Sequence, residues 1–344
     1  MANELILATA PLGMHWPTLD PFLFCAYHKD AYPCGNTNMG VSRELLSGRD
    51  IGADFSGKDG WSMYHGNEVP GFPRHPHRGF ETVTLARSGF IDHSDSLGAT
   101  ARFGEGDVQW MTAGRGIVHS EMFPLLQSEA DNPAELFQIW LNLPAANKMV
   151  APHFSMLWSN TIPRVNPSDS SGVELALIAG GLDGVMPPAP PPDSWASDPR
   201  SELCIWTVKL DSAARWRLPR GASDLSRVLY FFSGAQVRVN GETIDEGHAV
   251  QLVPDADISV ESDSSPAELL LLQGRPIGEP VAQHGPFVMN TQAEIQQAMR
   301  DYHDTGFGGW PWASDGPVHP RSEGRQARYP DGSLVTPTVS KYAE

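Results

Sequence analysis

Two histidine-bearing segments determine how this chain is interpreted. Residues 71–84 read GFPRHPHRGFETVT, and residues 104–121 read GEGDVQWMTAGRGIVHSE. Each segment carries two candidate metal ligands with one residue between them, namely His75 and His77 in the first and His119 and Glu121 in the second. Side chains on a β-strand alternate between its faces, so the members of each pair would project to the same side. If the two strands pair in one barrel wall, three imidazoles and a carboxylate converge on one point.

Four nitrogen and oxygen ligands suit a borderline transition metal and leave one or two positions open for water, dioxygen or substrate. An isolated His-x-His pair can also be a surface feature or a hydrogen-bonded part of a core. Pro76 lacks the N–H group of a regular central strand, so the first pair requires an edge or strand-start position. The second pair follows a glycine-rich turn in an apolar context, which favours the metal site.

The composition predicts an all-β chain. Its 344 residues are enough for two barrel-sized domains, and 40% of them are hydrophobic. The 33 glycines and 30 prolines fall between short apolar runs, which is typical of many short strands joined by turns. A helical bundle would not tolerate so many helix-breaking residues.

Charge and cysteine content narrow the expected partners and compartment. The formal net charge is −17, from 41 acidic and 24 basic residues, so we expect no direct nucleic-acid partner and no membrane partner. Cys25, Cys34 and Cys204 form a sparse, odd set that suits a reducing compartment. The N-terminal stretch does not resemble a secretory signal, and no apolar run approaches the ~20 residues that cross a bilayer. We therefore expect a cytoplasmic protein.

Strand-like runs such as ETVTLA and DVQWMTA, and later CIWTVKL and AELLLLQG, indicate two β-rich halves with a weak internal repeat. We predict an N-terminal metal-binding barrel with an N-terminal extension at 1–160 and a proline-rich linker or loop at 161–200. A C-terminal barrel without a metal site is predicted at 201–290, and a helix with a tail at 291–344. The helix rests on a capping box, Thr291 with Glu294, followed at helical spacing by Ile295, Ala298, Met299 and Tyr302.

The two motif segments, extended to Met122, resemble the pirin family, which belongs to the bicupin branch of the cupin superfamily. A looser likeness continues through residues 137–144 and 269–291. It fails before Gly71, in the proline-rich loop and after Trp312. The resemblance implies two β-barrels with one metal in the N-terminal barrel, bound by His75, His77, His119 and Glu121. Fe(II) is the expected ion, with Mn, Ni, Cu, Co or Zn as alternatives, and the general cupin pattern would use Glu81 in place of Glu121.

The resemblance also implies an activity, because some pirins cleave quercetin with dioxygen. On that reading the chain is a metal-dependent dioxygenase, an oxidoreductase of the quercetinase type, whose substrates are a flavonol and dioxygen. Glu121 is then both a ligand and the general base for the substrate hydroxyl, or a ligand only. A different class is a metal- or redox-sensing regulatory protein that binds a protein partner without turnover. A metal-stabilised structural barrel is the third.

Other residues near the motifs have simpler interpretations. Core packing rather than substrate contact is expected from the large apolar residues Phe72, Phe80, Trp110 and Met111. A surface role or contact with the ligands is expected from Arg78 and Arg115. We expect turn positions for His93 and Asp107, and structural or exposed positions for His248 and His284.

Overall fold

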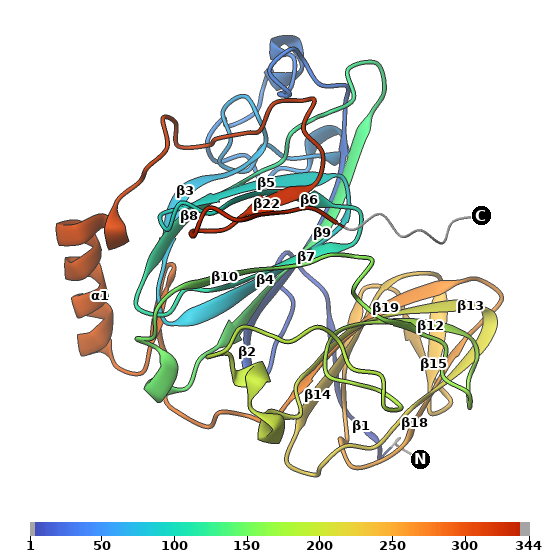
Figure 1. Ribbon diagram of the computed structural model, residues 1–344. Coiled ribbons are helices and arrows are strands. Elements are labelled where there is room, and N and C mark those ends of the chain that lie inside the picture. The colour runs from blue at the N-terminus through green and yellow to red at the C-terminus, as the bar shows by residue number, and fades with distance from the viewer. Residues whose placement is uncertain (1–3, 338–344) are drawn as a thin grey trace. The chain divides into compact units, whose positions relative to one another are not determined.

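The computed structural model describes residues 4–337, and the chain forms two compact units. We call residues 27–138, 145–160 and 279 onward the N-terminal barrel, and residues up to 26, 139–144 and 161–278 the C-terminal barrel. Strands dominate both units, and the described chain holds one α-helix (Figure 1). The fold is the all-β bicupin architecture expected from the sequence. None of the helices within residues 4–337 has the length and apolar character needed to cross a membrane.

The N-terminal barrel is built from two main sheets that face each other in Figure 1. The first has the strand order β23 (Leu334–Val335), β22 (Gln326–Arg328), β6 (Thr100–Gly104), β5 (Phe90–Asp95), β8 (Ile117–Met122) and β3 (Gly71–His77). The second has the order β10 (His153–Leu157), β7 (Asp107–Thr112), β4 (Phe80–Ser88), β9 (Asn132–Asn142) and β2 (Phe22–Tyr32). A separate hairpin joins β20 (Ala282–His284) to β21 (Phe287–Met289). Both candidate ligand pairs lie in the first of these sheets, His75 and His77 on β3 and His119 and Glu121 on β8.

Strand β3 is the edge strand of its sheet and pairs with β8. An edge position suits Pro76, because proline has no backbone N–H and cannot donate a hydrogen bond to a neighbouring strand. The register places His75 opposite His119, and an irregularity between Phe72 and His75 shifts the pairing nearer the start of the strand. The two ligand pairs, on β3 and β8, are therefore adjacent in space although more than thirty residues separate them in the chain.

The segment after the helix is fastened to the N-terminal barrel rather than forming a loose tail. Strand β22 pairs with β6, and the side chain of Arg102 reaches back to the segment that precedes β22. The Nε and Nη2 atoms of Arg102 each donate to the carboxylate of Asp92 at 2.7 Å, and its Nη1 donates to the carbonyl oxygens of Pro320 and Glu323 at 2.9 Å. A buried guanidinium needs such a full set of acceptors. The polar composition of this segment did not reveal these partners.

Helix α1 (Gln292–Thr305) begins at the predicted capping box, in which the Thr291 hydroxyl accepts from the backbone N–H of Glu294. Ile295 and Ala298 are buried against β8 and β21, whereas Met299, expected on the same face, is 38% exposed. The helical spacing of the apolar residues therefore predicted the helix correctly but included Met299, which is exposed, in the buried face. Short 3-10 turns occur at Arg43–Leu46, Lys58–Gly60, Ala145–Asn147, Trp195–Ser197, Pro199–Ser201 and Gly306–Gly308.

The C-terminal barrel is formed by one ten-stranded antiparallel sheet. Its order is β1 (Ile6–Pro11), β17 (His248–Leu252), β14 (Ser226–Ser233), β19 (Ala267–Gly274), β13 (Cys204–Leu218), β18 (Ile258–Ser262), β15 (Gln236–Val239) and β16 (Glu242–Asp245). Strand β12 (Ser171–Ala179) pairs with β13, and β11 (Arg164–Val165) pairs with β12. Alternate residues of the central strands, such as Trp206, Leu229 and Leu271, form the core, as the period of two along a strand requires.

The two units are discontinuous in sequence, whereas the boundaries expected at 160, 200 and 290 are linear. Strand β1, in the expected N-terminal extension, pairs with β17 of the C-terminal barrel. The expected linker contributes β11 and β12 to the same sheet, and its longest strand-free stretch is residues 180–200. Sheet pairing joins segments that are distant along the chain, so composition alone does not reveal which barrel a terminal strand completes.

Candidate metal centre

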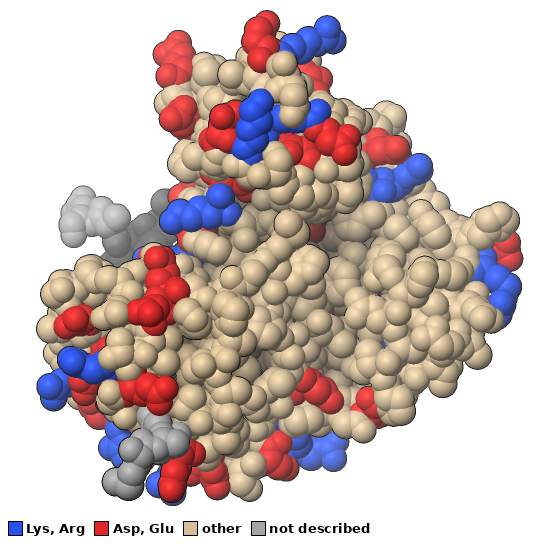
Figure 2. Space-filling view, turned by 180° about the vertical axis from the view of Figure 1, so that it is seen from behind, with Lys and Arg blue, Asp and Glu red and all other residues tan. Residues whose placement is uncertain are grey.

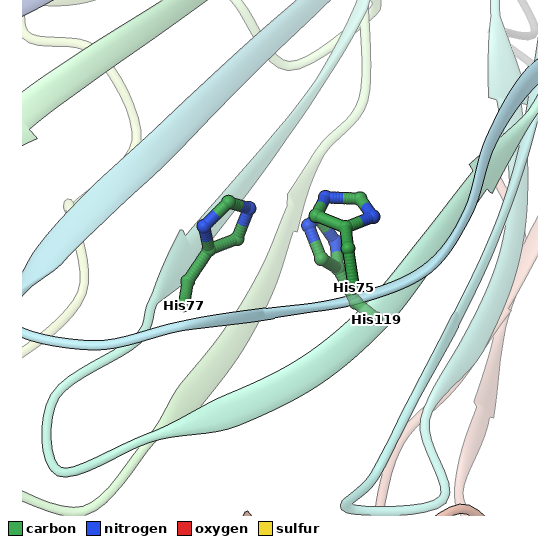
Figure 3. A group of neighbouring side chains, drawn as sticks. All are labelled: His75, His77 and His119. Carbon is green, nitrogen blue, oxygen red and sulfur yellow. The ribbon is translucent and has the colours of Figure 1, made fainter. Parts of the chain in front are cut away.

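Three histidine side chains meet inside the N-terminal barrel. His75 and His77 extend from β3 and His119 from β8, all to the same side of the sheet (Figure 3). One candidate ligand atom from each residue lies within 4.8 Å of the others. The ring centroids are 4.4 Å apart for His75 and His119, 4.8 Å for His75 and His77, and 4.9 Å for His77 and His119. The structure thus brings together the three histidines that the sequence singled out.

The protonation of these rings suits metal binding. Burial lowers the pKa of His75 to about 4 and holds the pKa values of His77 and His119 well below the ordinary histidine value, because an imidazolium would lose its hydration. The rings are therefore neutral near pH 7, which is the form that coordinates a metal ion.

Hydrogen bonding around the rings provides a test of fit. Both ring nitrogens of His119 are buried and have no hydrogen-bond partner among the described residues. The Nδ1 of His75 lies 2.9 Å from the carbonyl oxygen of Pro73 and donates to it, which leaves Nε2 with a free lone pair. Buried polar atoms without partners are rare and costly. A divalent transition-metal ion among the three imidazoles would take one nitrogen from each ring, including one of the two unpartnered nitrogens of His119, so the donor set fits the group that the sequence predicts.

Glu121 is adjacent to the three-histidine group but is not part of it. It follows His119 by two residues on β8, and its Oε1 lies 2.9 Å from the Thr84 hydroxyl, while its Oε2 lies 3.4 Å from the Nε2 of Gln138. Burial raises the pKa of Glu121, and its hydrogen bonds to Thr84 and Gln138 partly oppose that rise. The expected fourth ligand is thus held by other side chains at the border of the site.

Glu81, the alternative carboxylate, lies on β4 in the other sheet of the barrel. It is fully buried, and its Oε1 accepts a hydrogen bond of 2.6 Å from the hydroxyl of Thr112. It also lies outside the three-histidine group. Neither carboxylate shares the compact arrangement of the imidazoles, but only Glu121 lies on a strand that carries one of them.

His93 was expected in a turn, and the structure shows that this expectation is wrong. It lies within β5, opposite Glu121 in the register, with Asp95 opposite His119. Its fully buried ring is stacked on Phe154 at 5.0 Å and lies 5.5 Å from the ring of His119, while its Nε2 is 3.1 Å from the Oδ2 of Asp95. His93 and Asp95 have the same one-residue separation as the two ligand pairs, a signal that could have revealed this third polar strand.

The other residues near the motifs have mainly structural positions. Phe80, Trp110 and Met111 are fully buried, as expected of core residues, and half-buried Phe72 stacks on Tyr64 at 5.1 Å. Asp107 starts β7 rather than occupying an exposed turn, and its carboxylate accepts from the backbone N–H of Gly104 at 3.1 Å. His248 lies on β17 and His284 on β20, and neither belongs to the three-histidine group. The three-histidine group is the only one of its kind within residues 4–337.

The two arginines that flank the ligand segments differ from each other. Arg78 is buried, and its Nε donates to the carbonyl oxygen of Arg115 at 2.6 Å, while its Nη1 forms an ion pair of 2.6 Å with Asp301 on α1. Arg115 itself is exposed. Arg78 therefore connects the turn after β3 to the helix.

Comparisons with known proteins agree with this geometry. The family model described as Pirin matches residues 13–141, and the model described as Pirin C-terminal cupin domain matches residues 205–308. The match starts at residue 13, so the likeness extends well before Gly71, where we expected it to fail. The motif-rich segments are thus the most distinctive part of a longer similarity.

Individual relatives cover most of the chain. Pirin-1 of Arabidopsis thaliana is 41% identical over 236 residues, which are 68% of this chain and 77% of that protein. Human pirin is 37% identical over 249 residues, 70% of this chain and 79% of that protein. A crystal structure of quercetin 2,3-dioxygenase from Acinetobacter baumannii superposes with a TM-score of 0.69 at 26% identity, covering 90% of this chain and 99% of that one. With these matches, the bicupin fold and the three-histidine group, the chain belongs to the pirin family of the cupin superfamily.

Proposed function

We propose that this protein is a pirin-type, metal-dependent dioxygenase that cleaves flavonols of the quercetin type with dioxygen. The observation that carries the proposal is the buried three-histidine group, in which both nitrogens of His119 lack a partner among the described residues. The structural similarity to a quercetin 2,3-dioxygenase supports the reaction class. His75, His77, His119 and Glu121 are the proposed ligands, and Fe(II) is the proposed ion, with Mn, Ni, Cu, Co or Zn as alternatives.

A metal ion bound at this site would supply Lewis acidity toward a flavonol hydroxyl and a redox-active centre for the reaction with dioxygen. The residues of the chain provide orientation and proton transfer. Glu121 is the proposed base that takes the hydroxyl proton of the substrate, and its raised pKa, caused by burial, brings it nearer to the range useful for that role. Thr84 and Gln138 hold the two carboxylate oxygens.

The proposed partners are a flavonol and dioxygen, with neither nucleic acid nor membrane. On the face drawn in Figure 2, Lys and Arg residues lie scattered among Asp and Glu residues, a broad area carries neither, and no continuous basic surface is visible. The three free cysteines, Cys25, Cys34 and Cys204, support the reducing, cytoplasmic compartment that we propose.

The test is dioxygen consumption and loss of quercetin by protein loaded anaerobically with Fe(II). We expect turnover in the natural chain and its loss in His75→Ala, because that substitution removes one of three imidazole ligands. His284→Ala, which changes an exposed histidine outside the group, is the matched control and should retain full activity. Metal content must be measured in each sample, so that a missing ion is distinguished from a missing activity.

Full metal occupancy without consumption of dioxygen or quercetin would contradict the dioxygenase proposal. The alternative would then be a metal- or redox-sensing regulatory protein that binds a protein partner without turnover. A partner whose binding differs between the reduced and oxidised metal would favour that alternative. A chain that binds the metal and unfolds without it, but shows neither property, would be a metal-stabilised structural barrel.

A further inference from the structure

The C-terminal barrel contains a cavity of about 1030 Å³ at one end of its central strands. The segment Ala179–Pro199, rich in proline, forms one wall, and the ends of β13, β14 and β19 form the other. Met186 lines the cavity and is 71% exposed, so solvent reaches it. Nothing in the proposed dioxygenase function uses this space, because the three-histidine group lies in the other unit.

Three polar side chains form a row across the inner wall of this cavity. Cys204 on β13 is the register partner of Gln273 on β19, which is in turn the register partner of Arg227 on β14. All three line the cavity and are nearly fully buried. Two residues further along, the same strands carry core residues such as Trp206 and Leu229, so alternation directs the polar row inward.

Arg227 is the unusual member of the row. It is 2% exposed, its Nε donates to the Oε1 of Gln273 at 2.7 Å, and its buried Nη1 has no hydrogen-bond partner in the part of the chain that the structure describes. No carboxylate within residues 4–337 forms an ion pair with it. The equally buried Arg102 in the other barrel has a bidentate carboxylate and further carbonyl acceptors. A buried guanidinium without an acceptor for its charge is costly, so the cavity is arranged for an anion that the chain does not supply.

Glu202 and Asp257 favour the charged form of Arg227 electrostatically, but neither carboxylate forms an ion pair with it within the described residues. Glu202 forms an ion pair with Arg275 at 2.9 Å, and Asp198 pairs with Arg200 at 2.5 Å. Asp183 is exposed to solvent. A Cβ added at Gly221 would lie 3.1 Å from the Nη2 of Arg227, so the missing side chain at this position keeps space beside the guanidinium. Arg227 therefore lies in the wall of the cavity, with 2% of its surface exposed and Gly221 beside it.

We propose that this cavity binds a small organic carboxylate, with its carboxylate on the guanidinium of Arg227 and its apolar body against the proline-rich wall. A guanidinium presents parallel N–H donors that match the two oxygens of a carboxylate. Most of the remaining lining is apolar, including Leu182, Met186, Trp206 and the prolines between 187 and 192. An aromatic carboxylate suits this combination better than an inorganic anion, which would leave the apolar wall without contact.

The experiment is ligand-observed ¹⁹F NMR of the full chain with 4-fluorobenzoate, with 4-fluorobenzyl alcohol as the neutral analogue. We expect saturable binding of the benzoate, and binding of the alcohol at least about tenfold weaker because the charged hydrogen bonds are lost. Arg227→Met should raise the Kd for the benzoate at least about tenfold. His75→Ala should not change it, because the metal site lies in the other unit. This outcome separates the inference from the proposed dioxygenase function.

A second variant keeps the test decisive if Arg227→Met does not fold. Ala189 is exposed and lines the cavity, so Ala189→Trp should obstruct the binding space without removing a buried group. Thr243→Trp, at an exposed position on β16 outside the cavity, is its control. The proposal would be overturned if 4-fluorobenzoate showed no saturable binding at millimolar concentration. It would also be overturned if folded Arg227→Met or Ala189→Trp bound 4-fluorobenzoate as the natural chain does, or if inorganic phosphate displaced the benzoate equally well.

Discussion

Both barrels direct polar side chains inward through the alternation and register of their strands, but the side chains in the two barrels suit different ligands. In the N-terminal barrel, alternate residues of β3 and β8 direct three neutral imidazoles toward one point. In the C-terminal barrel, register partners on three strands direct a thiol, an amide and a guanidinium into a cavity. A similar backbone can therefore prepare a site for a cation or for an anion, because the residue types at inward positions decide its charge.

Two buried arginines show the same difference in energetic terms. Arg102 is satisfied within the N-terminal barrel by Asp92 and by carbonyl groups. Among residues 4–337, Arg227 donates a hydrogen bond to Gln273 and its Nη1 has no partner. The fully hydrogen-bonded arrangement of Arg102 is typical of a structural group, and the incompletely hydrogen-bonded arrangement of Arg227 is typical of a ligand-binding group.

The largest expected effect is on metal binding. His119→Ala removes the imidazole whose two buried nitrogens have no hydrogen-bond partner among the described residues, so we expect the bound metal to fall from one ion per chain to none. Metal analysis of anaerobically loaded protein measures this. His248→Ala in the C-terminal barrel should retain the ion, and equal loss in both variants would remove the distinction between the barrels.

The next effect is on stability. Arg102→Met leaves the buried carboxylate of Asp92 without its counter-ion, and we expect the free energy of unfolding to fall by about 3–5 kcal/mol. Arg227→Met leaves no buried charge behind and should change that free energy by no more than about 1 kcal/mol. Urea denaturation monitored by circular dichroism compares the two variants. Similar losses would show that Arg227 has a structural role like that of Arg102.

The smallest effect sharpens the description of the metal centre. Thr84→Val removes the hydroxyl that lies 2.9 Å from Glu121 while keeping a β-branched side chain on β4. We expect metal affinity, measured by competition with a chelator, to fall about tenfold as Glu121 loses its orientation. Thr243→Val on the surface of the C-terminal barrel should leave affinity unchanged. An unaltered affinity in Thr84→Val would mean that Glu121 takes no part in holding the ion.

Residue spacing accounts for the part of the predicted site that the structure brings together. The separation of His75 from His77 requires that they share a face once β3 is extended, and Pro76 requires an edge strand. The capping box at Thr291 predicted the start of α1 from local chemistry alone. His93 was missed because its segment reads as a turn until the pairing of β5 with β8 places it opposite Glu121.

The sequence by itself determined the strand-rich fold, the family and the identity of the three histidines, because alternation and capping act over a few residues. Only the tertiary structure decided that Glu121 is held by Thr84 and Gln138, and that β1 and the segment around β22 complete different barrels. It also decided that Arg227 lines a cavity without a counter-ion among the described residues. These features depend on the register between strands that are distant in the chain. Such pairing is fixed by the packing of the whole sheet, which no local pattern encodes.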